Sequence, residues 1–426
     1  MADVPVSRRS AAGPLAAFRL QRAGVVYALV AVAICFQVIT LSKGLPVFLS
    51  MSSARNIVDQ SALDGILVIS MTMLLITGNF DLSVGATAGL AGAAGLIVAN
   101  SHGVVLGTLI ALGIGLIIGT VNGVLVQVVG VNAFIVTLGM LTAVQGLLLI
   151  VTNGNTVLAT AGQFGALGTG LIRLWPPAAV IAGVVLLGYA VARAAGKAGA
   201  RAPGTRVDGG VITAGVLGIL AIVGGTALSG LAVETAESWI MLTYMVAASL
   251  LLRFTVVGRR VYAVGGNAEA ARLSGINVSR YKIGAFIVTS LSASLAGLTY
   301  AGKFGAVEPT ALVNEELPVL AAAILGGTSL FGGSGYVLKS VVGVLILSSL
   351  TEGFNVLNLG ANAQYLVQGI VIIAAAAVYT VAGRRRRVAG TAPDTEPAQA
   401  RTEAATGTDG TGQPAPSADP AGSPGN

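Results

Sequence analysis

Long apolar runs alternate with short polar segments along most of this chain. Most runs reach the roughly 18 residues with which an α-helix crosses about 30 Å of hydrocarbon, and only helices and closed barrels satisfy their backbone groups in lipid. We therefore predict an all-α integral membrane protein, a polytopic helical bundle of about 10–12 transmembrane segments. The runs lie near 24–42, 57–77, 82–100, 103–128, 134–152, 175–193, 211–232, 238–257, 282–302, 318–331, 337–356 and 363–382.

Composition agrees with a membrane protein and excludes several kinds of chemistry. The 426 residues are 54% hydrophobic and 10% charged, whereas soluble domains carry about 25% charged residues. With Cys35 and His102 as the only cysteine and histidine, the sequence can form neither an intrachain disulfide nor a metal cluster. The 426-residue sequence also contains no phosphate-binding loop of the G-x-x-x-x-G-K-[ST] type. We expect no enzyme activity and no bound cofactor, with any ATP used by a separate subunit.

Clusters of Lys and Arg predict the orientation, because cytoplasmic loops of membrane proteins are rich in them. The tail 1–23, the loop 193–206, the segment 253–282 and the run 384–387 are basic. We expect a cytoplasmic basic tail at 1–23, a transmembrane domain at 24–383 and a cytoplasmic tail at 384–426 that lacks the apolar residues to order itself. The basic regions do not form a nucleic-acid footprint. An even number of crossings then separates each basic region from the next, which requires the short run 318–331 to cross completely or a neighbouring segment to compensate.

A polar stretch at 259–282 carries its own helix signals. Gly265 and Gly266 end the preceding helix, Asn267 is a preferred N-cap residue, and Gly275 lies where a left-handed C-terminal cap would fall. Because a helix of two turns is unstable alone in water, it must pack on something. Its apolar stripe is formed by Ala270, Leu273 and Ile276, and would pack on a partner or on the core.

Polar residues at membrane depth are candidates for a solute pathway. Asp81 is the clearest, since a carboxylate there faces a cavity, a partner or a helix end. It either caps the following helix or lines the path, and the two roles are compatible. Asp59 reads as a solvated loop-edge residue and Asp64 as a buried hydrogen-bonding group. The candidate pathway residues are Asn79, Phe80, Asp81, Ser83, Asn122, Thr328, Ser329 and Gln364.

Two glycine-rich motifs introduce similar patterns in the two halves of the chain. Residues 78–85 read GNFDLSVG and residues 326–333 read GGTSLFGG, and each precedes a long apolar span. Paired glycine-interrupted segments often line transporter pathways. In a chain with 59 glycines, chance is an equal explanation.

Four strings resemble the permease subunits of bacterial carbohydrate ABC importers of the ribose, xylose and galactose type. They read GNFDLSVGATAGLAG, NAFIVTLGML, YAVGGNAEAARLSGINVSRYK and LAAAILGGTSLFGGSGYVLKSVVG. The resemblance covers about 56–380, and the extra apolar material at 175–231 looks like the xylose-type permeases.

This resemblance implies a pentose importer in the bacterial cytoplasmic membrane. Its partners would be an ABC ATPase subunit, an extracytoplasmic sugar-binding protein and a second copy of the chain. The helix after Gly266 would be the coupling helix that docks on the ATPase. The coupling residues would be Gly266, Asn267, Glu269, Ala271, Arg272, Leu273, Ser274 and Gly275.

Two other classes of function stay open from the sequence. An ion-coupled secondary transporter would need Asp64, Asp81 or Glu352 to titrate, and the sequence shows few ionisable groups at membrane depth and no pairs. A membrane scaffold or sensor would carry no solute, so its polar residues would be replaceable.

Truncation after Arg387 should leave transport close to that of the full chain, because the tail lacks apolar residues that could pack. Uptake by cells that express both forms at equal levels measures this. A large loss of uptake would show that the tail binds a partner.

Overall fold

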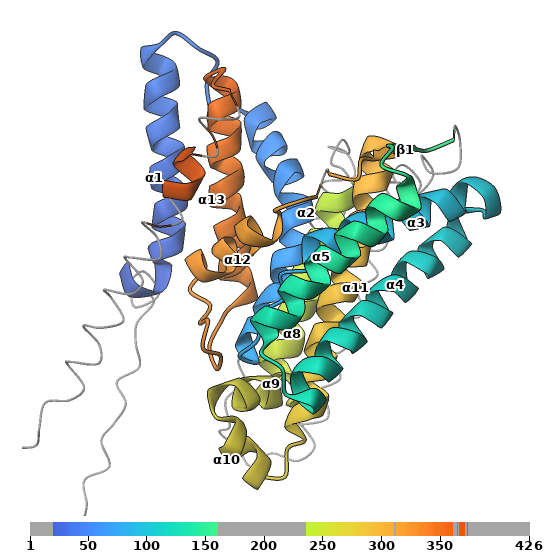
Figure 1. Cartoon of the computed structure of the whole chain (residues 1–426). Coiled ribbons are helices and arrows are strands. Elements are labelled where there is room, and N and C mark those ends of the chain that lie inside the picture. The colour runs from blue at the N-terminus through green and yellow to red at the C-terminus, as the bar shows by residue number, and fades with distance from the viewer. Residues whose placement is uncertain are drawn as a thin grey trace, which may run out of the picture. The chain divides into compact units, whose positions relative to one another are not determined.

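The computed structural model describes residues 20–160, 236–310, 312–360, 364, 366–370 and 373 (Figure 1). They belong to one unit, Met1–Ala377. Two short strands, β1 (Val157–Leu158) and β2 (Ala306–Val307), pair antiparallel. The helices are α1 (Leu20–Ser42), α2 (Met51–Ile76), α3 (Val84–His102), α4 (Val104–Val124), the π-helix η2 (Leu125–Val129), α5 (Ala133–Thr152), α8 (Ala236–Phe254), α9 (Val256–Gly266), α10 (Ala268–Leu273), α11 (Val278–Phe304), α12 (Glu316–Leu325) and α13 (Val337–Val356).

The predicted all-α membrane fold is confirmed. Among the described residues, eight helical stretches are long and apolar enough to cross a membrane. The runs predicted at 175–193 and 211–232, most of 363–382 and both predicted tails apart from 20–23 lie outside the described residues. The count of 10–12 segments therefore stays a prediction.

Capping explains two of the helix boundaries that differ from the apolar pattern. α2 begins at Met51, six residues before the predicted run, because the Ser50 hydroxyl accepts the Ser53 N–H at 3.1 Å. The run predicted at 238–257 ends at Phe254, because Thr255 accepts the Gly258 N–H at 3.1 Å and starts α9. Polar caps, and not hydropathy, therefore decide where these two helices begin and end.

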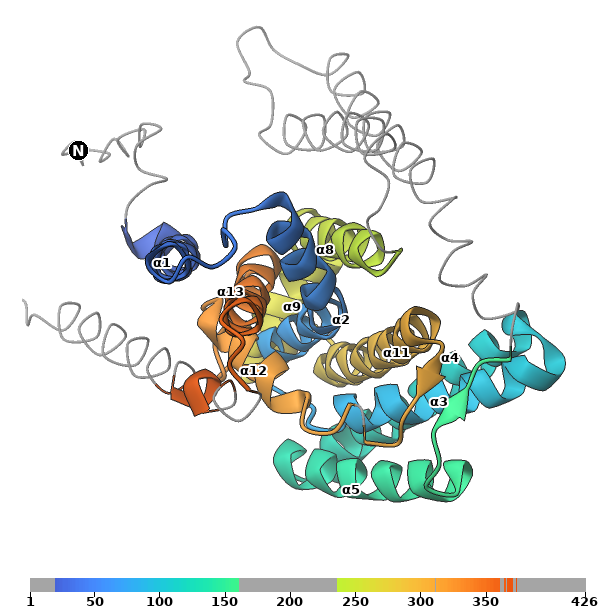
Figure 2. The same cartoon turned by 90° about the horizontal axis from the view of Figure 1, so that it is seen from above.

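Helices α2 and α11 form the centre of the bundle (Figure 2). α11 packs against α2, α3 and α4, and α2 also packs against α8, α12 and α13. One large apolar cluster joins α2, α8, α12 and α13, and a second joins α3, α4, α5 and α11. Each half of the bundle thus has its own core, with α11 shared between them.

Glycines on α4 allow its close approach to α11. A Cβ on Gly119 would lie 2.7 Å from the Ile287 Cα, and one on Gly123 would lie 3.0 Å from the Ile283 Cα. Gly115 faces Ser290 in the same way. The Gly-x-x-x-Gly spacing puts all three on one helix face, and small residues are favoured where membrane helices pack closely.

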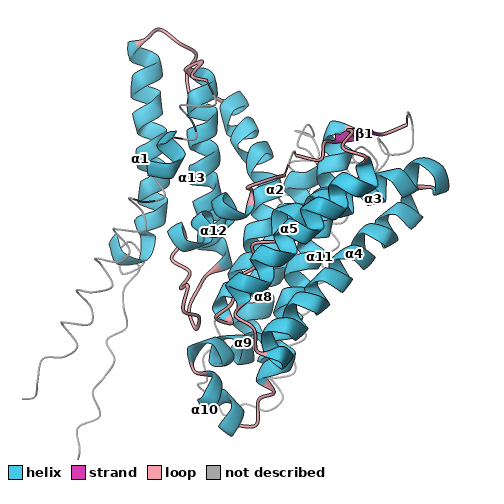
Figure 3. Ribbon diagram, in the orientation of Figure 1, coloured by secondary structure: helices cyan, strands magenta, loops and turns pink. Residues whose placement is uncertain are grey.

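The chain crosses the bundle between α11 and α13 without a full-length helix. Lys303, near the end of α11, contacts Asp59 near the start of α2, whereas Gly333 donates to the carbonyl of Ile76 at the other end of α2. α12 has ten residues, about 15 Å of helix, so a non-helical stretch supplies the rest of the crossing. The loop after α12 runs to the end that carries α9 (Figure 3). The short run at 318–331 is thus part of a broken crossing.

Gly119→Ala should destabilise the protein by about 2 kcal/mol, since the added methyl group must push α4 away from α11. Thermal unfolding in detergent measures the effect. The control is Gly113→Ala on the same helix, where a Cβ meets nothing within 4 Å. Equal melting temperatures for the two variants would contradict the close packing.

Candidate functional site

The helix predicted after Gly266 is present as α10. The Asn267 side chain accepts the Ala270 N–H at 2.9 Å and caps its start. At its end Gly275 has φ +79°, its N–H donates to the Arg272 carbonyl, and the Ile276 N–H donates to the Ala271 carbonyl at 3.0 Å. This paired C-terminal cap is the one glycine favours. The caps stabilise a helix of only six residues.

Two of the three residues in the predicted apolar stripe of α10 are exposed. Leu273 is 81% exposed and Ala270 is exposed, while Ala271 is 4% exposed and faces the protein. Ile276 is half-buried. The alternative of packing on the core was therefore wrong for Leu273. The remaining predicted coupling residues, Gly266, Asn267, Glu269, Arg272, Ser274 and Gly275, are exposed.

Asp81, Ser83 and Asn122 form one buried cluster. Asp81 Oδ1 accepts the Ser83 N–H at 2.8 Å and the Ser83 hydroxyl at 2.6 Å, and Asn122 Nδ2 donates to Asp81 Oδ2 at 3.2 Å. All three are fully buried. The N-cap of α3 is Ser83, whose side chain makes no cap bond. Asp81 is therefore not the helix cap that the sequence allowed, because it accepts the N–H of Ser83 itself. Three donors thus surround a carboxylate whose burial is otherwise costly.

The other predicted pathway residues make contacts outside this cluster. Asn79 donates to Thr77, and the rings of Phe80 and Phe134 meet edge to face with centroids 6.4 Å apart. Thr328 shares a hydrogen bond with Ser340 at 3.1 Å. Ser329 Oγ accepts the Phe331 N–H, and Gln364 donates to Thr351. The structure therefore unites three of the eight residues and places the others in separate local contacts.

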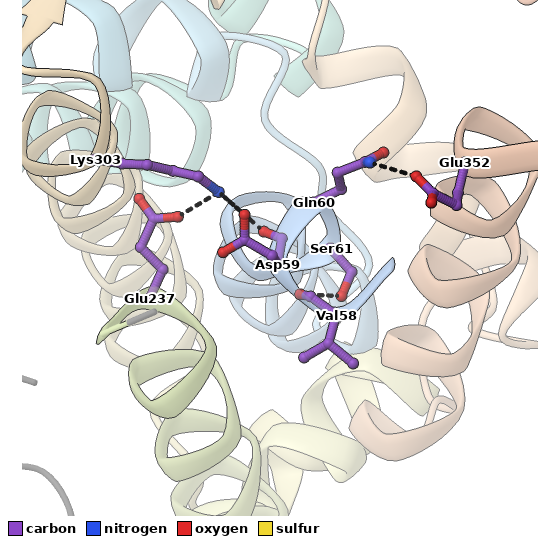
Figure 4. A network of polar contacts seen from close by, with 7 residues as sticks. All are labelled: Val58, Asp59, Gln60, Ser61, Glu237, Lys303 and Glu352. Atoms are coloured by element: carbon purple, nitrogen blue, oxygen red, sulfur yellow. Dashed lines mark hydrogen bonds and ion pairs between the residues drawn. The ribbon is translucent and has the colours of Figure 1, made fainter. Parts of the chain in front are cut away.

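Sequence reasoning missed a polar network at the end of the bundle opposite α10 (Figure 4). Lys303 Nζ lies 2.8 Å from Asp59 Oδ2 and 3.1 Å from Glu237 Oε2, which joins α11, α2 and α8. Gln60 donates to Glu352 of α13 at 3.1 Å. Lys303 directly follows the predicted run 282–302, and Asp59 lies near the start of the run 57–77. Antiparallel packing of these two spans would bring the two residues together, and this was the signal from which the ion pair could have been predicted.

Asp64 contacts a second carboxyl group with which the sequence analysis had not paired it. Its side chain lies close enough to that of Glu315, which precedes α12, for the two to interact. The two carboxyl groups interact with each other, so the expectation of no ionisable pairs at membrane depth was wrong. Both this pair and the Lys303 network join residues far apart in sequence, which is why inspection of single spans missed them.

Comparison with known proteins places the chain among permeases. It is 33% identical over 346 residues to the xylose transport system permease protein XylH of Escherichia coli K12, covering 79% of this chain and 87% of that protein. It is 32% identical over 338 residues to the ribose import permease protein RbsC of the same organism, covering 78% and 87%. XylH of Haemophilus influenzae is 34% identical over 341 residues, covering 77% and 88%.

These relatives confirm the resemblance to ribose- and xylose-type permeases. No solved structure matches the chain significantly. Residues 53–376 match the family described as "Branched-chain amino acid transport system / permease component". That match extends from α2 through the described part of the chain after α13, and so includes α10, the Asp81 cluster and the Lys303 network. The chain therefore belongs to this family of membrane permease components.

Proposed function

We propose that this chain is the membrane-spanning subunit of an ATP-binding-cassette importer for a monosaccharide, a pentose such as xylose. Its similarity to a xylose and a ribose permease supports the solute class. The chain would bind no ATP itself, because its sequence contains no phosphate-binding loop. A separate ATPase subunit would supply the energy.

The observation that carries this proposal is the exposed coupling helix. α10 is capped at both ends, so its conformation is held by the chain, yet Leu273 is 81% exposed beside Glu269 and Arg272. An exposed leucine flanked by both charge signs fits a groove on another protein, with the apolar side chain buried and the charges at the rim. We assign this groove to the ATPase subunit.

Charge supports a cytoplasmic position for the α10 end. Arg259, Arg260, Arg272 and Arg280 are exposed there, and basic residues accumulate on the cytoplasmic side. Glu237 and Asp59 lie at the opposite end, which would face the sugar-binding protein. With this orientation, the start of α1 and the basic tail before it lie in the cytoplasm.

The complex would contain two copies of the chain around a central pathway. Exposed apolar side chains cover α1, α4 and α5, with Ile34, Ile117 and Ile150 among the most exposed, and lipid together with the second copy would cover them. ATP binding and hydrolysis would move α10 and expose the pathway to each side in turn. The Asp81 cluster would lie beside that path.

Purified chain in proteoliposomes should import xylose only when the ATPase subunit, the sugar-binding protein and ATP are all present. Uptake of labelled xylose and ribose measures both transport and preference. A protonophore should leave the rate unchanged, because ATP supplies the driving force.

The alternative function is an ion-coupled secondary transporter, and the structure offers a candidate proton site for it. The Asp64–Glu315 pair is the kind of carboxyl site that carries protons in such proteins. Uptake that continues without the ATPase subunit and stops with a protonophore would establish the rival and refute the importer.

The double variant Glu269→Lys, Arg272→Glu should insert normally but lose most ATP-dependent uptake, because it reverses both charges beside the exposed Leu273. Co-purification of the ATPase subunit and sugar uptake measure docking and transport separately. Lys43→Glu, an exposed charge reversal near the opposite end, is the control. Undiminished uptake by the double variant would count against docking at α10.

A further inference from the structure

Three distant segments meet backbone to backbone directly before α10. The Gly333 N–H donates to the Ile76 carbonyl at 2.9 Å, which ties the loop after α12 to the end of α2. Gly265, near the end of α9, lies so close to Ile76 that an added Cβ would overlap the Ile76 carbonyl oxygen. A Cβ on Gly332 would lie 2.7 Å from the Gly265 oxygen and 2.9 Å from the Gly78 Cα. We call these contacts the glycine junction.

A side chain of α9 adds a further bond to the junction. The Tyr262 hydroxyl donates to the Gly335 carbonyl at 2.8 Å. Burial, with a smaller contribution from Tyr336, raises the pKa of Tyr262, so its hydroxyl keeps the donated proton across the physiological range. α9 therefore holds the loop by a side-chain hydrogen bond as well as by backbone contact.

Glycine is required here for two separate reasons. Gly78, Gly332 and Gly333 have φ of +83°, +86° and +73°, a region that other residues rarely adopt. Gly265 has no such angle but lacks room for a side chain. The two glycine motifs noted in the sequence thus meet each other, since Gly78 belongs to one and Gly332 to the other.

The junction lies close in sequence to α10 on one side and to the Asp81 cluster on the other. Asn267 is both the C-cap of α9 and the N-cap of α10, so no flexible loop separates α10 from Gly265. On the other side, Gly78 is three residues from Asp81, whose carboxylate is bonded to Asn122 on α4. Backbone atoms in direct contact leave little room for one segment to move without the others.

We propose that the glycine junction transmits the displacement of α10 to the loop 77–83 between α2 and α3, which carries Asp81 and is called the Asp81 loop below. In this way the junction would couple ATP hydrolysis to opening of the pathway. Gly265, Gly332 and Gly333 act as positioning residues that touch neither nucleotide nor solute. The inference rests on the proposed function, since it requires an ATPase subunit that moves α10.

The test compares two glycines of the same loop in the reconstituted complex. Gly332→Ala and Gly327→Ala place alanine at nearly equal φ, +86° and +85°, but a Cβ on Gly327 meets nothing within 4 Å. The two alanines thus share the unfavourable positive φ, and only Gly332→Ala forces the segments apart. ATP hydrolysed per xylose imported should rise about fivefold or more in Gly332→Ala and stay unchanged in Gly327→Ala, with equal ATPase co-purification.

A second variant guards against failure of Gly332→Ala to fold. Tyr262→Phe removes only the hydrogen bond to Gly335 and should raise the ATP-to-xylose ratio in the same direction. If the Gly332→Ala complex does not assemble, the ATP-to-xylose ratio of Tyr262→Phe tests the role of the junction. An unchanged ratio in an assembled Gly332→Ala complex, or in Tyr262→Phe, would overturn the junction's role while leaving the importer intact. Absence of ATP-dependent uptake by the unmodified chain would instead refute the proposed function and the coupling role together.

Discussion

Direct contact between backbones at glycine positions is the constraint on which this structure depends. Gly115, Gly119 and Gly123 bring α4 against α11, and Gly297 of α11 packs on the backbone of α3 at Ala88. Lipid supplies no hydrophobic drive for helix association, so close van der Waals packing must hold the bundle. The same device recurs at the glycine junction, where it joins loops instead of helices.

The two ends of the bundle are held by different interactions. At one end, Lys303, Asp59 and Glu237 connect three helices through ion pairs, and such contacts are directional but allow side chains to rearrange. At the α10 end, backbone atoms touch with no side chain between them. Backbone contacts thus hold the α10 end of the bundle, and side-chain ion pairs hold the Lys303 end.

The broken crossing between α11 and α13 links these ends. It starts beside the Lys303 network, includes the Asp64–Glu315 contact, and finishes in the loop that carries Gly332 and Gly333. Non-helical backbone at membrane depth is tolerated where protein buries it, and transporters use such segments near their pathways. The Asp81 loop and this crossing meet at Gly78.

The sequence by itself determined the membrane class, most helix boundaries and the caps of α10, because hydropathy and cap chemistry act over a few neighbouring residues. It also singled out Asp81, Ser83 and Asn122, although not their union in one cluster. Only the tertiary structure decided that Leu273 is exposed, that Lys303 meets Asp59 and Glu237, and that Gly78, Gly265 and Gly332 touch. These contacts join residues up to about 250 positions apart, and no local pattern records which face of one helix meets another.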